Sequence, residues 1–105
     1  MVIKMIAEFS VVPLDKGESV SEYVSEMLDI IDKSGVDYRF TPMATVVEGD
    51  WDEVMDLISR CHHEMRKRSK RVVTDIKIDD REGAKNRISG KIESVEKKVG
   101  RELNK

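Results

Sequence analysis

Apolar residues alternate with other residues near the N-terminus and recur at helical spacing further along. In residues 2–12 every odd position is apolar, which predicts a strand with one dry face. Ser19 and Glu22 have the spacing of a capping box, and an apolar stripe at three- and four-residue spacing follows them. We therefore expect a helix that begins at Ser19 and ends near Ser34 and Gly35.

The middle of the chain predicts a hairpin and a second helix. Residues 38–41 and 45–48 are short β-rich runs, separated by so few residues that they should pair. Asp50 and Glu53 form a second capping box, and an apolar stripe continues from there to the basic residues 66–68. Cations suit the C-terminus of a helix, so we expect the second helix to end there.

A fourth strand and a last helix complete the predicted fold. Residues 71–79 alternate again, which gives the order β-α-β-β-α-β. This is the ferredoxin-like α+β arrangement, in which two helices cover one face of a four-stranded antiparallel sheet. An additional C-terminal helix, at about residues 86–103, has a narrow apolar stripe that is closer to a coiled-coil seam. By its length, the whole chain, residues 1–105, forms one domain.

The alternation also predicts a sheet face that neither of the two covering helices shields. The helix-covered face should contain Met5, Ala7, Phe9, Tyr38, Phe40, Ile76 and Ile78. The open face should contain Ile6, Ser10, Val12, Arg39, Thr41, Met43, Val73, Asp75 and Lys77. We expect Thr45 and Val47 to join the open face, although valine at both Val46 and Val47 leaves the phase of this strand unsettled by the pattern.

The open face is half apolar, and contiguous apolar patches of this kind are rare on monomers. We therefore expect a homo-oligomer in which another subunit, or a ligand together with a subunit, covers this face. Two alternatives stay open: scattered valines that simply face water, and a dimer that forms by pairing of edge strands.

Composition narrows the possible partners and the compartment. Nineteen basic and twenty-one acidic residues give a net charge of −2, which provides no global attraction to nucleic acid or to an anionic membrane. Cys61 is the single cysteine and cannot form an internal disulfide. The N-terminal residues match neither a signal peptide nor a membrane span. We expect a cytoplasmic protein.

The sequence gives little support to catalysis or metal binding. Residues 61–65 contain a cysteine, two histidines, a glutamate and a methionine, but adjacent helical residues point about 100° apart and cannot share an ion. The basic cluster in residues 60–71 suits either an anion site or a solvated helix end. No catalytic triad, phosphate-binding glycine loop or aromatic RNA platform is present. We expect a non-enzymatic protein without a cofactor or a metal.

Three segments carry a resemblance to a known family. SVVPLDKGESVSEYV at residues 10–24, TPMATVVEGDWDEV at 41–54 and RVVTDIKIDDR at 71–81 resemble the thiamine-binding family of small ferredoxin-like proteins, long left uncharacterised. Ala44 departs from the glycine expected in many relatives. The resemblance implies a homo-oligomer, often a tetramer of sheet-packed dimers. It further implies that thiamine or its pyrimidine part is bound at or near subunit contacts.

Thiamine would need polar partners for its aminopyrimidine ring and a carboxylate, aromatic or sulfur neighbour for its cationic thiazolium. The candidate hydroxyl partners are Ser10, Thr41 and Thr45, the candidate anions are Asp75 and Glu48, and Met43 is the candidate apolar wall. The competing hypothesis is a structural or regulatory oligomer, in which these are ordinary strand residues at a subunit interface.

Overall fold

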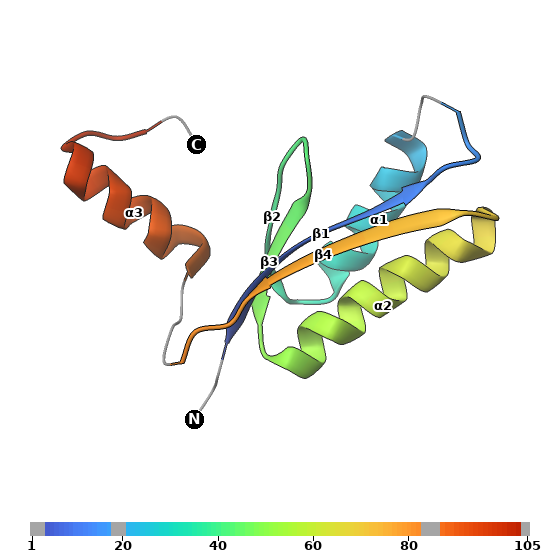
Figure 1. Ribbon diagram of the computed structural model, residues 1–105, viewed down its shortest axis with the longest axis horizontal. Helices are drawn as coiled ribbons and strands as arrows, with labels where there is room; N and C mark the ends of the chain where they lie inside the picture. Colours follow the sequence, from blue (N-terminus) through green and yellow to red (C-terminus); the bar gives the residue numbers. More distant parts are fainter. Residues whose placement is uncertain (1–3, 18–20, 83–86, 104–105) are drawn as a thin grey trace.

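The computed structural model describes residues 4–17, 21–82 and 87–103. Its elements follow the predicted order, and a third helix comes after the last strand (Figure 1). They are β1 (Met5–Pro13), α1 (Ser21–Lys33), β2 (Asp37–Phe40), β3 (Thr45–Gly49), α2 (Trp51–Arg68), β4 (Val72–Asp79) and α3 (Arg87–Val99). The predicted N-cap of the first helix, Ser19, lies outside the described residues.

The four strands form one antiparallel sheet in the order β2-β3-β1-β4, which confirms the ferredoxin-like α+β fold. Helices α1 and α2 pack together on one side of this sheet, whereas α3 stands apart from them and contacts β3 (Figure 1). None of the helices in the described parts of the chain is long and apolar enough to cross a membrane.

The core lies between the sheet and the two covering helices. It contains the inward residues of β1, the apolar stripes of both helices and one valine of β3. All five residues of the stripe predicted for the second helix are buried, namely Val54, Leu57, Ile58, Cys61 and Met65. This stripe packs because the period of the helix brings all five side chains to the face that the sheet covers.

The start of α2 is fixed by the predicted capping box. The Asp50 carboxylate accepts a hydrogen bond from the backbone N–H of Glu53 at 2.8 Å. The Glu53 carboxylate accepts one from the backbone N–H of Asp50 at 3.1 Å. The two side chains thus satisfy backbone donors that have no partner inside the helix, and they fix where β3 ends.

The strand register corrects one expectation about the open face. Phe9 pairs with Thr45 and Ala7 pairs with Val47, so Thr45 and Val47 share the helix-covered face and are buried there. The expectation that they join the open face was therefore wrong. The alternation in β3 is ambiguous, because Val46 is also apolar, and only the pairing with β1 fixes its phase.

Residues of the two edge strands lie on the expected face but are incompletely covered. Tyr38 and Phe40 on β2, and Ile76 and Ile78 on β4, share the helix-covered face by register. All four side chains are nevertheless substantially exposed. The two helices cover the centre of the sheet more fully than its edges.

Candidate functional site

Strand β1 extends beyond the end of its neighbour β3, and this mismatch opens a cavity. β1 pairs with β4 from Ile6 to Pro13, but its pairing with β3 stops at Phe9 and Thr45. Residues 10–12 therefore have β4 on one side, and no strand of the described segments pairs with their other side. The cavity here has a volume of about 210 Å³ and lies between the end of β1, the β2–β3 turn and α1.

The walls of the cavity are mainly apolar. Helix α1 contributes one side of the cavity through the stripe that also faces the core, namely Val24, Met27, Leu28 and Ile31. The hairpin and β1 contribute Phe9, Val11, Val12, Phe40, Pro42, Met43 and Ala44. Ser10, Thr41 and Thr45 are the lining residues that carry hydroxyl groups. Apolar walls with a few polar groups are typical of small-molecule sites.

The hydroxyl of Thr41 holds the turn together. It donates to the carbonyl of Ala44 at 2.8 Å and accepts from the backbone N–H groups of Ala44 at 3.1 Å and Met43 at 3.3 Å. The backbone N–H of Thr41 also donates to the carbonyl of Ala44, at 2.9 Å. Thr41 therefore shapes the cavity wall by fixing the backbone of residues 41–44.

The hydroxyls of Ser10 and Thr45 differ from that of Thr41. Within the described segments, neither hydroxyl takes part in a side-chain hydrogen bond, although both residues line the cavity. Thr45 is buried, whereas Ser10 is half-buried. By register, Thr45 shares the covered face with Phe9, whereas Ser10 lies in the open-face phase of β1, at the edge that β3 does not pair.

Four of the six candidate residues thus line one cavity: Ser10, Thr41, Met43 and Thr45. Met43 is 87% exposed at the tip of the turn. Asp75 does not line the cavity, but it is the cross-strand partner of Ser10 and lies on the open face beside it.

Glu48 is separated from this group. It pairs with Ile6 on the open face, near the end of β3, and is only 4% exposed. Its Oε1 lies 3.5 Å from the backbone nitrogen of Ile88, in the first turn of α3. A carboxylate at a helix N-terminus is electrostatically favourable, so Glu48 helps to place α3 against the sheet.

Several lining residues were absent from the candidates that the sequence suggested. Phe40 was assigned to the covered face, and Val24 and Leu28 to a core stripe, whereas the structure places all three on the cavity wall. One usable signal was the difference in length between the first predicted strand, residues 2–12, and the third, residues 45–48. A long strand beside a short one leaves part of its edge unpaired.

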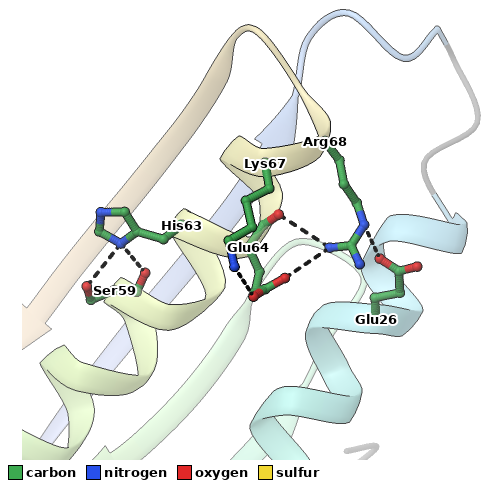
Figure 2. Close-up of polar contacts among 6 residues, drawn as sticks. All are labelled: Glu26, Ser59, His63, Glu64, Lys67 and Arg68. Carbon is green, nitrogen blue, oxygen red and sulfur yellow. Dashed lines mark hydrogen bonds and ion pairs between the residues drawn. The ribbon is translucent and has the colours of Figure 1, made fainter.

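Two residues of the basic cluster near the end of α2, Lys67 and Arg68, form ion pairs with neighbouring carboxylates (Figure 2). Arg68 donates to the carboxylate and the backbone carbonyl of Glu64, both at 3.3 Å, and lies 3.0 Å from a carboxylate oxygen of Glu26 on α1. Lys67 donates to the Glu64 carboxylate at 2.9 Å. The Lys67 ammonium, with Arg68 nearby, holds the pKa of Glu64 below its ordinary value. The charges of Lys67 and Arg68 are thereby balanced within the chain.

The two adjacent histidines point to different partners. Nδ1 of His62 lies 2.7 Å from the hydroxyl of Thr74 on β4, and Nδ1 of His63 lies 2.7 Å from the backbone carbonyl of Ser59 (Figure 2 shows the latter). Among the described residues, no three histidine, cysteine, aspartate or glutamate side chains gather in a way that could hold a metal ion.

Comparisons with known proteins agree with this fold. A family model described as "Thiamine-binding protein" matches residues 7–96. A UPF0045 protein of Methanocaldococcus jannaschii is 36% identical over 92 residues, which cover 88% of this chain and 92% of that protein. The UPF0045 protein YqgV of Bacillus subtilis is 35% identical over 98 residues, covering 88% and 94%.

Solved structures are similar over the same region. The crystal structure of the Methanocaldococcus protein superposes with a TM-score of 0.82 and covers 88% of this chain and 95% of that one. The structure of a Thermotoga maritima protein, described as a candidate thiamine biosynthesis/salvage protein, has a TM-score of 0.77 at 26% identity and covers 88% of this chain and 98% of that one.

Proposed function

Because the chain belongs to the thiamine-binding protein family, we propose that it binds thiamine, or the pyrimidine part of thiamine, in the cavity beside the β2–β3 turn. It acts by binding and not by catalysis. It is a cytoplasmic homotetramer that is built from dimers. The observation that carries this proposal is that a single cavity collects Ser10, Thr41, Met43 and Thr45.

The size of the cavity favours one ring of the ligand over the whole molecule. Its volume of about 210 Å³ is below the range of roughly 300–1,000 Å³ that is usual for small-molecule sites. We place the aminopyrimidine ring inside, against the hydroxyl of Thr45, with Ser10 at the edge of β1 where the ligand leaves the cavity. Residues 10–12 of β1 have no pairing with β3, so their peptide groups that face away from β4 supply further donors and acceptors.

The cationic thiazolium then extends from the cavity. Asp75 is exposed beside Ser10 and can complement this charge, and Met43 and Phe40 provide a soft, apolar mouth. A second subunit that covers this mouth would complete the site. This explains how a small cavity can serve a larger ligand, and why such exposed apolar side chains occur there.

Calorimetric titration with thiamine and with hydroxymethylpyrimidine tests the proposal. Filling the cavity with Leu28→Trp should abolish binding of both molecules. Thr45→Val removes a hydroxyl with little change of shape, and should weaken both by about tenfold, as expected for the loss of one hydrogen bond. Asp75→Ala should weaken thiamine but leave the uncharged pyrimidine almost unaffected.

Thr74→Val is the control for the chemical change, because it replaces a threonine on β4, outside the cavity lining, and it also removes the contact between the Thr74 hydroxyl and His62. Its unfolding temperature should be measured together with that of Thr45→Val, so that a folding defect is recognised. Flat titrations of the wild-type protein with both molecules would overturn the proposal. A stable oligomer that neither molecule protects against heat would instead favour the structural or regulatory role, since a ligand bound only to the folded state must raise stability.

A further inference from the structure

A second cavity lies in the groove between helices α1 and α2. Its volume is about 570 Å³, which falls within the range of roughly 300–1,000 Å³ that is usual for small-molecule sites. None of its lining residues lines the cavity beside the β2–β3 turn. Helix α1 contributes Glu26, Asp29 and Ile30 to it, and α2 contributes Arg60, Glu64 and Arg68.

Charged side chains of both signs line the two walls of this groove. On α2, Arg60, Glu64 and Arg68 are four residues apart, so they form one stripe along the groove. The end of α2 lies beside the first half of α1, since Arg68 reaches across to Glu26 (Figure 2). The cavity therefore contains two guanidinium groups and three carboxylates.

The charges at the Arg68 end of the cavity neutralise one another. Arg68 lies 3.0 Å from the carboxylate of Glu26 and 3.3 Å from that of Glu64. Lys67 lies 2.9 Å from the other oxygen of Glu64. Two positive and two negative charges are thus paired, and this end has little net attraction for a charged ligand.

The remaining lining groups are open to a ligand. Within the described parts of the chain, no ion pair joins Arg60 to a carboxylate, and Arg60 is exposed. Asp29 lies 2.9 Å from Lys33, but this pair is solvent-exposed, so it is weak and leaves the carboxylate accessible. Ile30 packs against the core and adds an apolar surface. A ligand therefore meets a cation, an anion and an apolar group.

This combination of groups selects the class of ligand. Arg60 would attract a simple anion, but the carboxylates on both walls would repel it, and the two guanidinium groups would repel a simple cation. A zwitterion avoids both conflicts. A guanidinium can bind its carboxylate with two parallel hydrogen bonds, and a carboxylate can accept from its ammonium group. An aliphatic part of the same molecule gains by covering apolar surface.

We propose that the groove between α1 and α2 binds a free amino acid with an aliphatic side chain. Its carboxylate contacts Arg60, its ammonium group contacts Asp29 and its side chain covers Ile30. This site is additional to the one proposed for thiamine and does not depend on it, because the two cavities share no lining residue. Helix α1 borders both cavities with different faces.

A nuclear magnetic resonance titration with L-leucine as the probe tests this site. The backbone amide signals of residues 25–30 and 60–68 should shift until they saturate, whereas those of residues 41–45 should keep their positions. L-leucine methyl ester lacks the carboxylate and N-acetyl-L-leucine lacks the ammonium group. Each should bind at least about tenfold more weakly than L-leucine, because each loses a charged hydrogen-bonding partner.

Substitutions identify the residues that hold the two charged groups. Arg60→Gln should weaken binding of L-leucine by at least about tenfold and leave titrations with thiamine unchanged. Arg71→Gln is the matched control: it makes the same replacement at an exposed arginine of the same basic cluster, outside the cavity lining, and should leave binding of L-leucine unchanged. Asp29→Asn should weaken L-leucine and reduce the preference for it over N-acetyl-L-leucine.

Circular dichroism checks that each variant is folded, and Arg60 is exposed, so its replacement should not disturb the fold. Three results would overturn the proposed site: no saturable shifts with millimolar L-leucine, equal affinities of Arg60→Gln and Arg71→Gln for L-leucine, or shifts confined to the cavity beside the β2–β3 turn.

Discussion

Replacing Gly49 with alanine tests how closely the end of β3 is fitted to the start of α2. An added Cβ would lie 2.7 Å from Oε1 of Glu53, and 3.3 Å from a methyl carbon of Val54. This Glu53 oxygen accepts the hydrogen bond from the backbone N–H of Asp50. The new methyl group would therefore displace the carboxylate that completes the capping box, and press on a fully buried valine.

The expected cost follows from these contacts. Losing the hydrogen bond from Asp50 costs about 0.5–1.5 kcal/mol of unfolding free energy. Crowding Val54 adds to this, since overpacking commonly costs about 1–3 kcal/mol. Alanine restricts the unfolded chain more than glycine does, and this raises the unfolding free energy by about 0.4–1 kcal/mol, which offsets part of the cost. We expect Gly49→Ala to lower the unfolding free energy by about 0.5–4 kcal/mol. In a Glu53→Ala background the carboxylate is absent, so the same change should cost about 1 kcal/mol less.

Urea unfolding followed by far-UV circular dichroism measures these differences at one fixed protein concentration. Gly35→Ala is a matched control: Gly35 has φ of 80° and no atoms within 4 Å of an added Cβ. Its cost, about 1–2 kcal/mol, comes from the backbone alone and should be the same with and without Glu53. The reasoning is refuted if Gly49→Ala also costs the same in both backgrounds.

Three further predictions concern other parts of the fold. Hydrogen bonds from the hydroxyl of Ser69 at 2.5 Å and the backbone N–H of Lys70 at 2.9 Å hold the pKa of Asp15 below its ordinary value of 3.8. Asp15→Asn should therefore lower the unfolding free energy at neutral pH relative to the wild type. This loss should vanish as acid protonates Asp15 below pH 3.8. A loss that stays the same throughout an acid titration would contradict the prediction. Burial raises the pKa of the Cys61 thiol to about 11, so iodoacetamide at pH 8 should label it only after unfolding, as mass spectrometry would show. Leu57→Ala, at a fully buried position, should cost about 2–5 kcal/mol in urea unfolding, and a loss below 1 kcal/mol would contradict the packing described.

The order of elements could be read from the sequence because local rules determine it. The Asp50 capping box marks the start of α2, and the stripe that ends at Met65 has an unambiguous helical period. The alternation in β1 was equally clear, so its covered face was predicted correctly. These features depend on neighbours within a few residues, and a one-dimensional pattern contains them.

The phase of β3 and the position of the cavity depend on contacts between distant residues. Val46 and Val47 are both apolar, so only the pairing of Ala7 with Val47 decides which of them is covered. The cavity exists because β3 stops at Thr45 while β1 continues to Pro13. The predicted strand lengths indicate that part of β1 stays unpaired, but only the pairing between distant residues fixes which part.

The short strand β3 connects three features that lie apart in the fold. Its first residue, Thr45, lines the cavity, and its last, Gly49, leaves just enough room for the carboxylate that caps α2. Between them, Glu48 is buried beside the first turn of α3. A shift of β3 by one residue along β1 would turn Thr45 away from the covered face and bring Glu48 into the core, where a carboxylate without a partner is very costly. The register of β3 is therefore strongly fixed, and with it the position of the Thr45 hydroxyl that we propose contacts the ligand.

The capping box of α2 also constrains the position of β3, from outside the sheet. We therefore expect substitutions at Gly49 to alter the cavity as well as the stability of α2, although Gly49 is not among the residues that line it.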